Sequence, residues 1–233
     1  MKQVPLARPV LGTHDGLSYA LYLPDHEPHG GIVILHGAGS AKESHFDFAR
    51  LARAHGLAAL AYDARGHGRS EGEFGPGAID DVLAMCDLLR PHTPRIAVRG
   101  SSLGGFCAIL AAAASNGTVG AVAAICPAPE YLLLRGVRND TLEGFRADRA
   151  ALEDWLQTVR LDDATAALAP RTALLLMHAR GDEQVPYTVS QELYDRAGEP
   201  KRLLLMPGGH HRSLQHDGEL QSESLRFIER ALG

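Results

Sequence analysis

The sequence predicts an α/β fold in which helices cover both faces of a mainly parallel β-sheet. Short, continuous apolar runs of the kind found in strands buried on both faces recur along the chain. Segments with apolar residues at helical spacing stand between them, as the crossover connections of a parallel sheet require. The 233 residues, 45% of them hydrophobic, are enough for one large domain with a substantial core. We therefore expect residues 1–233 to form a single domain.

Seven segments are predicted to be strands. They are residues 17–23, 31–35, 57–62, 96–98, 119–126, 172–177 and 202–206. The first of these segments ends at Pro24 and is therefore placed near a sheet edge. Helices with an apolar stripe are predicted over residues 48–52, which Gly56 ends, over 79–89, which Pro91 ends, and over 106–114 and 220–231. Because ligands bind beyond the carboxyl ends of such strands, polar residues that follow a strand are the candidates for function.

The segment from Pro127 to Leu168 interrupts this alternation. It is rich in polar and charged residues, with an apolar run at 132–134 and a helix-like stretch over 145–159. A stretch of roughly 40 residues is long for a plain connection in a compact domain. We therefore interpret residues 127–168 as a small cap insertion over the site. A surface helix without substrate contact is the alternative.

Composition and charge exclude several classes of protein. The net charge of −5 and the lack of a long Lys/Arg run argue against a nucleic-acid-binding protein. No apolar run approaches the roughly 20 residues that span a bilayer, and residues 1–9 lack the apolar core of a signal peptide. The cysteines lie in apolar segments and are expected to be buried free thiols, as in a reducing compartment: Cys86, Cys107 and Cys126. We expect a cytoplasmic protein without a membrane partner.

The segment Gly100-Ser101-Ser102-Leu103-Gly104 is the strongest functional signal in the chain. It follows a predicted strand and opens a predicted helix, which is the context of a nucleophile elbow. The turn is so tight that side chains two residues before and after the nucleophile would clash, and the glycine spacing selects Ser102. Choosing Ser101 instead would place Arg99 and Leu103 at the crowded positions. An ordinary turn in which a serine caps the helix is the alternative.

A serine nucleophile needs a base within hydrogen-bond reach and an acid that holds the base. Asp182 lies in a Gly-Asp turn directly after a predicted buried strand, and His210 and His211 lie in a glycine-rich loop after the next strand. The order Ser, Asp, His along the chain favours a catalytic triad. Taken alone, the aspartate is more simply a helix cap and each histidine a solvated side chain. The residues themselves leave the choice between His210 and His211 open.

An oxyanion hole needs backbone N–H groups directed at the developing negative charge. One is expected from Leu103, at the positive amino-terminal end of the helix that follows Ser102. The other is expected from the loop of residues 36–40, with Ala38 as the first choice and Gly39 as the second. An anion-binding loop before a helix is the alternative, but this loop lacks the Gly-Lys-Ser/Thr ending of a P-loop.

Five motifs, in this order, resemble the landmarks of the α/β-hydrolase superfamily. They are His36-Gly37-Ala38-Gly39, Asp63-Ala64-Arg65-Gly66-His67-Gly68-Arg69-Ser70, residues 100–105, Gly181-Asp182-Glu183-Gln184-Val185-Pro186, and residues 207–211. The chain resembles small serine esterases of the dienelactone-hydrolase and acyl-esterase type, which have little or no cap. The resemblance implies an α/β-hydrolase fold with a mainly parallel sheet of about eight strands.

The resemblance also implies roles for individual residues. Ser102 is the expected nucleophile and Asp182 the expected acid. The pattern Pro-Gly-x-x-His, usual among relatives, places the base at His211, and His210 is then expected to line the pocket. In relatives the second motif is chiefly structural, so its polar residues are expected to form hydrogen bonds within loops: Asp63, Arg65 and His67.

We predict a serine hydrolase, carboxylesterase-like, that cleaves carboxylic esters through an acyl-enzyme intermediate. Peptidase, thioesterase or acyltransferase chemistry on the same triad is the alternative among enzymes, and a non-catalytic hydrolase-like binding protein is the alternative of another class. No cofactor or metal is expected, because the adjacent His210 and His211 cannot present two ligands as a His-x-x-x-His helix pair does. The expected partners are a small-molecule acyl ester and water, for a monomer or homodimer.

Overall fold

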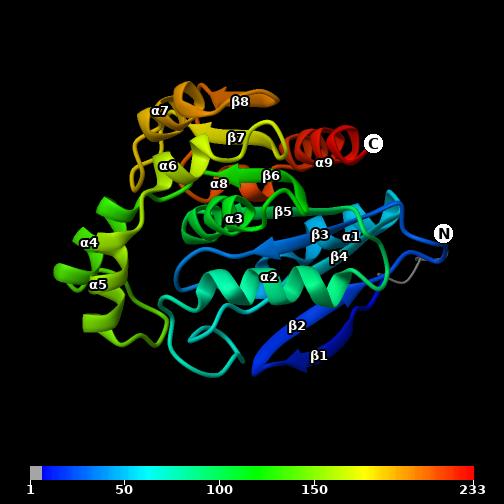
Figure 1. Cartoon of the computed structure of the whole chain (residues 1–233), viewed down its shortest axis with the longest axis horizontal. Coiled ribbons are helices and arrows are strands. Elements are labelled where there is room, and N and C mark those ends of the chain that lie inside the picture. The colour runs from blue at the N-terminus through cyan, green and yellow to red at the C-terminus, as the bar shows by residue number, and fades with distance from the viewer. Residues whose placement is uncertain (1–6) are drawn as a thin grey trace.

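The computed structural model describes residues 7–233 and contains one eight-stranded sheet. Its strand order is β1-β2-β4-β3-β5-β6-β7-β8 (Figure 1). In chain order, β1 to β8 are Val10–His14, Leu17–Tyr22, Gly30–Leu35, Leu57–Tyr62, Ile96–Ser101, Val119–Ile125, Ala173–Ala179 and Lys201–Met206. The six strands from β3 to β8 are parallel, whereas β2 is antiparallel to both of its neighbours. The predicted α/β fold with a mainly parallel sheet is confirmed.

The antiparallel edge of the sheet contains one strand that the sequence analysis missed. Residues 17–22 form β2, which lies near the edge as predicted, and β1 is the edge strand itself. β1 has no continuous apolar run because its side chains are exposed or only half-buried. Asp15 and Gly16 join the two strands, both with positive φ, as a two-residue hairpin turn requires. Of residues 1–9, considered above for a leader sequence, 1–6 lie outside the described residues.

Helices cover both faces of the sheet. The long helices α2 (Ala78–Leu89) and α3 (Leu103–Ala114) pack on one face, and α1 (Phe46–Ala54) and α9 (Gly218–Leu232) pack on the other (Figure 1). The remaining helical segments are the 3-10 helix η1 (Lys42–His45), α4 (Glu130–Arg138), α5 (Arg149–Thr158), α6 (Leu161–Ala166), α7 (Thr188–Arg196) and α8 (Ser213–His216). Within residues 7–233, every helix is too short or too polar to traverse a lipid bilayer.

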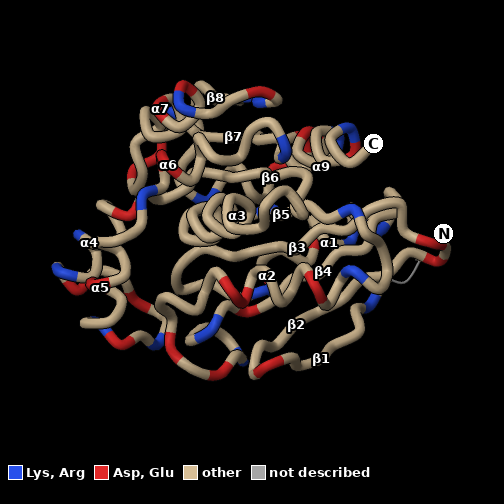
Figure 2. Tube along the Cα trace, in the orientation of Figure 1, with Lys and Arg blue, Asp and Glu red and all other residues tan. Residues whose placement is uncertain are grey.

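The central strands are buried on both faces, which explains their continuous apolar sequences. All residues of β3, β4 and β5 are buried. Alternate side chains point to opposite faces, so Val33 packs with α2 and α3, whereas Ile32 and Ile34 pack with α1 and α9. The small residues of α3 let it lie close to the sheet. This helix carries no charge and is tan in the middle of Figure 2, while Lys, Arg, Asp and Glu gather toward the periphery.

Residues 127–168 form α4, α5 and α6 between β6 and β7. Figure 1 shows α4 and α5 to the left of the sheet, past the carboxyl ends of the parallel strands. The helix predicted over residues 145–159 begins later than expected, because the Asp148 side chain accepts hydrogen bonds from the N–H groups of Ala150 and Ala151 and caps α5. Phe145 lies in a bend, and residues 146–148 lead into the helix without regular secondary structure.

Aromatic contacts attach α5 to the body of the sheet. The ring of Trp155 meets the ring of Phe106 on α3 edge-on, with the centroids 5.8 Å apart. It meets the ring of Phe74 in the same manner at 6.1 Å. Leu152 and Leu156, on the same helix, are buried in the core that α2 and α3 share. The segment 127–168 is therefore packed on the sheet domain rather than held by its ends alone.

Candidate active site

Ser102 stands at a sharp turn between the carboxyl end of β5 and the start of α3. Its φ of 54° and ψ of −117° lie in a region that costs a non-glycine residue roughly 1–3 kcal/mol. Two hydrogen bonds to the chain around β6 hold it there. The Ser102 N–H donates to the Ile125 carbonyl at 2.9 Å, and the Ala128 N–H donates to the Ser102 carbonyl at 3.2 Å. A strained, firmly held serine is the geometry that the sequence pattern predicts.

Gly100 and Gly104 occupy the two crowded positions of this turn. A Cβ on Gly100 would overlap the carbonyl group of Gly104, and a Cβ on Gly104 would overlap the carbonyl oxygen of His36. These neighbours are backbone atoms, so they cannot rotate away as a side chain would. The glycine spacing that selects Ser102 therefore has the steric cause inferred from the sequence. Ser101, by contrast, is the last residue of β5 and is buried.

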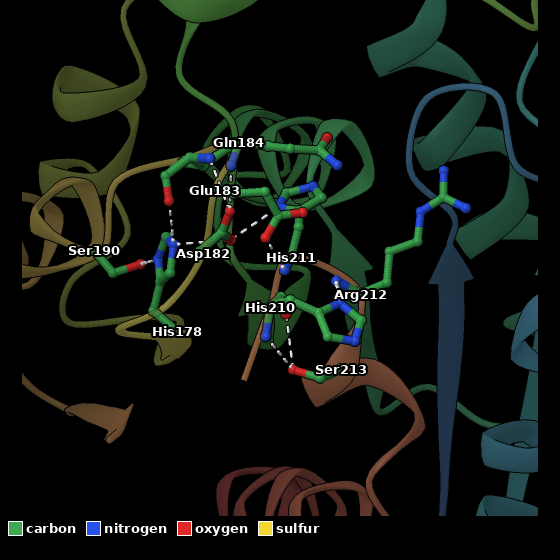
Figure 3. A network of polar contacts seen from close by, with 10 residues as sticks. His178, Asp182, Glu183, Gln184, Ser190, His210, His211, Arg212 and Ser213 are labelled. Carbon is green, nitrogen blue, oxygen red and sulfur yellow. Dashed lines mark hydrogen bonds and ion pairs between the residues drawn. The ribbon is translucent and has the colours of Figure 1, made fainter. Parts of the chain in front are cut away.

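Asp182 and His211 meet beyond the carboxyl ends of β7 and β8 (Figure 3). Nδ1 of His211 lies 2.8 Å from Oδ2 of Asp182, so the Nδ1–H donates to the carboxylate. Oδ1 of Asp182 accepts from the N–H groups of Gln184 and Val185, both at 2.9 Å. The backbone N–H of His211 donates to Oε2 of Glu183 at 3.2 Å, which ties the histidine loop to the aspartate turn. The Asp182 side chain is completely buried.

His178 is the member of this network that the sequence analysis missed. Its Nε2 lies 3.3 Å from Oδ2 of Asp182 and 2.9 Å from the Val185 carbonyl oxygen. Its Nδ1 lies 2.7 Å from Oγ of Ser190, so the hydroxyl donates to Nδ1 and the Nε2–H donates to the two oxygens (Figure 3). His178 is fully buried inside the apolar strand β7, where its sequence context indicates only a core residue. Its position four residues before Asp182 is the one available signal.

Hydrogen bonds keep the carboxylate of Asp182 charged. Burial alone raises the pKa of Asp182, but the hydrogen bonds from His178 and His211 and from the N–H groups of Val185 and Gln184 outweigh burial. Together they hold this pKa far below its usual range. A carboxylate that stays ionised can orient the imidazole of His211 and stabilise its protonated form.

A cavity of about 420 Å³ brings Ser102 and His211 together. Both residues line it, although no hydrogen bond joins their side chains among the described residues. His210 does not line the cavity, so the expectation that it would is wrong. Its backbone N–H donates to Oγ of Ser213 at 2.9 Å, in a turn that leaves the His210 side chain exposed to solvent. Of the two adjacent histidines, only His211 is therefore placed beside Ser102.

The loop of residues 36–40 lies directly against Ser102. A Cβ on Gly37 would contact the Ser102 Cβ at 3.4 Å. Of the two donors considered in this loop, Ala38 lines the cavity and Gly39 does not. Across residues 7–233, neither the N–H of Ala38 nor that of Leu103 donates a hydrogen bond to the protein. Both N–H groups are therefore available to an oxygen atom of a ligand.

Buried polar contacts fix the loops beside the site. His36 Nε2 accepts a hydrogen bond from the Ala64 N–H at 3.0 Å, and Nδ1 then donates to the Gly37 carbonyl at 2.8 Å. Burial lowers the pKa of His36, so the ring stays neutral in this arrangement. Asp63 accepts hydrogen bonds from Nζ of Lys42 at 2.6 Å and from the Lys42 N–H at 2.8 Å. The Lys42–Asp63 pair is almost fully buried.

The other polar residues of the second motif also make internal contacts. Arg65 forms two hydrogen bonds to the carboxylate of Asp81. His67 lies 3.2 Å from the Arg65 carbonyl oxygen through Nδ1, and its ring stacks on Phe145 at 4.5 Å. Neither Arg65, His67 nor Asp63 lines the cavity. Their contacts agree with the structural role expected for this stretch.

Cys126, Asp182 and His211 form the one group within residues 7–233 whose donor atoms lie close enough, within 4.8 Å of one another, to share a metal ion. A cysteine ligand must lose its proton to bind a metal. Burial, with the nearby negative charges of Asp182 and Glu183, raises the pKa of Cys126, and Asp182 already accepts hydrogen bonds at both oxygens. The three residues therefore do not fit a zinc site. All three cysteines of the chain are buried and free, as predicted.

A family model and several known proteins have sequences similar to this chain, over different shares of its length. A family model described as serine aminopeptidase, S33, matches residues 26–139. The uncharacterized protein YfhR of Escherichia coli O157:H7 is 26% identical over 209 residues, which cover 86% of this chain and 70% of YfhR. Monoglyceride lipase of Homo sapiens is 33% identical over 111 residues, which cover 45% of this chain and 37% of the lipase.

Solved structures share the whole fold. Est1E from Butyrivibrio proteoclasticus superimposes with a TM-score of 0.77 over 97% of this chain and 98% of its own, at 21% sequence identity. At that level of identity the likeness demonstrates a common fold. Because nearly the whole of both chains is covered, this common fold extends over almost their full lengths.

Proposed function

We propose that the chain is a serine hydrolase of the α/β-hydrolase superfamily, an esterase that cleaves small carboxylic esters with Ser102 as its nucleophile. The observation that carries the proposal is the hydrogen bond between His211 and Asp182, made beside the cavity that Ser102 also lines. A serine, an imidazole held by an ionised carboxylate and two unused backbone donors are the parts that acyl transfer needs.

In the proposed reaction, Oγ of Ser102 attacks the ester carbonyl while Nε2 of His211 accepts its proton. The hydrogen bond from Nδ1–H to Asp182 selects the tautomer that leaves Nε2 free to accept. The protonated imidazole then donates this proton to the oxygen of the leaving alcohol, and an acyl-enzyme remains on Ser102. Water, deprotonated by His211, attacks the acyl-enzyme and restores the free serine. The hydrogen bond between Ser102 and His211 forms as substrate enters, a tightening common in such sites.

The N–H groups of Ala38 and Leu103 are proposed to bind the oxyanion of the tetrahedral intermediate. Leu103 is the first residue of α3, where the helix dipole adds a partial positive charge. Loss of one such donor typically costs about 3–4 kcal/mol in the transition state. The positions of both donors are set by backbone, so they need no rearrangement when charge develops.

We further propose that the chain is a single domain and that residues 127–168 act as its small cap. Support comes from α4, which contributes Leu132, Leu133 and Gly136 to the cavity lining. The buried free cysteines support a cytoplasmic location.

The family description also raises the alternative of an aminopeptidase. Such an enzyme binds the α-ammonium group of its substrate, which calls for a carboxylate or several acceptors near the scissile bond. The cavity lining contains no aspartate or glutamate. This disfavours an aminopeptidase, whereas thioesterase and acyltransferase chemistry would use the same triad without that requirement.

Fluorophosphonate labelling with peptide mapping, run beside hydrolysis of p-nitrophenyl esters of increasing chain length, tests the proposal. We expect one adduct, on Ser102, and turnover that peaks at one chain length. Ser102→Ala should lose both labelling and turnover, while the neighbouring Ser101→Ala variant should still be labelled at Ser102. No adduct and no hydrolysis would favour a non-catalytic binding protein, and an adduct without ester turnover would favour amide, peptide or acyl-transfer chemistry.

A further inference from the structure

The cavity around Ser102 has a charge that ester hydrolysis itself does not require. Its lining includes two arginines, Arg135 on α4 and Arg212 next to His211, and no acidic residue. The whole chain has 28 acidic against 23 basic residues, so its average surface favours negative charge. The charge of the cavity lining is therefore opposite in sign to the net charge of the whole chain.

Neither arginine has a carboxylate partner within residues 7–233. Several other exposed arginines do: Arg138, also on α4, forms an ion pair with Glu153 at 2.7 Å. Arg135 and Arg212 are both exposed, and their guanidinium groups make no hydrogen bond or ion pair in the described part of the chain. Figure 3 shows the Arg212 side chain extended away from the network around Asp182, with no contact drawn at its end.

A third arginine lies behind the cavity wall. Arg99 on β5 is fully buried, with its guanidinium 3.9 Å from the centre of the Phe48 ring. It donates to Oγ of Ser224 at 3.3 Å and to the carbonyl oxygen of Gln215, a cavity residue, at 3.5 Å, and it has no acidic partner among the described residues. Burial lowers the pKa of Arg99 to about 9, so the group remains charged at neutral pH. A buried, unbalanced charge acts over a longer range than an exposed one.

We propose that this cavity selects esters that also carry an anionic group, a carboxylate or a phosphate, which Arg135 and Arg212 bind while Ser102 attacks the ester carbonyl. The inference rests on the proposed esterase function and adds a substrate class to it. Guanidinium groups suit such anions because their N–H donors match two anion oxygens at once. Asn139 and Thr141 line the same cavity and offer further polar contacts. The anionic group is bound and does not react.

The test compares kcat/KM for pairs of esters in which one member carries an anionic group that the other lacks. With the anion on the leaving group, 4-acetoxybenzoate and 4-acetoxyphenyl phosphate are set against neutral methyl 4-acetoxybenzoate. With the anion on the acyl group, ethyl hydrogen adipate is set against diethyl adipate. The first set separates carboxylate from phosphate recognition. The readout is the ratio of kcat/KM for the anionic ester to that for its neutral partner.

We expect the wild-type protein to prefer at least one anionic ester about 10- to 100-fold, as a hydrogen bond between charged groups provides. The double variant Arg135→Gln, Arg212→Gln should lower this ratio at least tenfold, and added salt should lower it in the wild type. The matched control is Arg230→Gln, which removes the same charge from an exposed site on α9 and should change the ratio less than twofold.

Two results would overturn the inference in different ways. If neutral esters are hydrolysed and labelling occurs at Ser102, but the ratio is near one or does not respond to the double variant, the anion subsite is wrong and the esterase function stands. If the wild-type protein hydrolyses neither member of any pair and takes up no fluorophosphonate, the esterase function fails and the subsite inference fails with it.

Discussion

His178 and His211 bind the same oxygen of Asp182, Oδ2, from opposite sides of the carboxylate. The distance from Nδ1 of His211 is 2.8 Å and that from Nε2 of His178 is 3.3 Å. His178 belongs to the buried strand β7, whereas His211 lines the cavity. Asp182 thus connects a residue fixed in the core to the residue proposed to move protons, and the orientation of His211 depends on both.

His178→Leu is expected to lower the free energy of unfolding by about 2–4 kcal/mol. The change leaves the Ser190 hydroxyl and the Val185 carbonyl without their buried partner, and each such loss costs about 1–3 kcal/mol. Urea denaturation followed by circular dichroism measures the change. Ser190→Ala is the milder control, because it removes one hydrogen bond and keeps the contact to Asp182. Equal stability of His178→Leu and wild type would show that the histidine only fills space.

Stability should depend on the ionisation of Asp182. Its pKa is lower in the folded protein than the value of about 3.9 in an unfolded chain, so the ionised carboxylate stabilises the fold above about pH 4. This contribution is lost progressively as the pH falls below 4 toward the folded pKa. Asp182→Asn is therefore expected to be clearly less stable than wild type at pH 7, with the difference shrinking by pH 3. Urea denaturation at pH 7, 5 and 3 measures it, and a difference that stays constant with pH would contradict the prediction.

His211→Ala should reduce kcat by several orders of magnitude, on the order of 10⁴-fold, since a catalytic triad acts as a unit. His210→Ala should change kcat less than threefold, because His210 is exposed and does not line the cavity. Steady-state hydrolysis of p-nitrophenyl acetate, with circular dichroism to verify folding, compares the two variants. The reverse order, a severe loss in His210→Ala and a mild one in His211→Ala, would mean that the base has been assigned to the wrong histidine.

Gly104→Ala is expected to destabilise the protein by at least about 2–3 kcal/mol, because its Cβ would overlap the carbonyl oxygen of His36. In an unobstructed helix the same exchange favours folding by up to about 1 kcal/mol. Gly218 offers that control, since it begins α9 and a Cβ there would meet nothing within 4 Å. The unfolding temperature should therefore fall in Gly104→Ala and should rise or stay unchanged in Gly218→Ala. Equal changes of the unfolding temperature in both variants would contradict the view that steric contacts require glycine at position 104.

The interior of the fold was predictable because burial on two faces leaves a plain signal. β3 and β4 appear in the sequence as unbroken apolar runs, and Gly56 and Pro91 mark helix ends within two residues of those observed. The edge was less predictable. β1 is exposed or half-buried along its length, so apolar periodicity does not identify it. The pair Asp15-Gly16 carried the missing information, because Asp-Gly is a favoured two-residue hairpin turn.

The candidate site was predictable where chain geometry alone dictates the residue. The glycines around Ser102 are required by backbone contacts, and the pattern therefore names the serine. His178 was not predictable, because a histidine in the apolar run of β7 has no local feature that distinguishes a ligand of Asp182 from a core residue. The charge of the cavity also depends on tertiary structure. Arg135 and Arg212 lie 77 positions apart in the sequence (212 − 135), and they line the same cavity only after the chain folds.

One part of the cavity wall comes from a different segment of the chain than the proposed reacting groups. Ser102, Asp182 and His211 follow strands of the sheet, whereas Leu132, Arg135 and neighbouring wall residues sit on α4. A transplant of residues 127–168 from a relative would then exchange the range of accepted esters without rebuilding the chemistry. In protein engineering, and in divergence after gene duplication, α4 could therefore be replaced while the residues at the strand ends are kept.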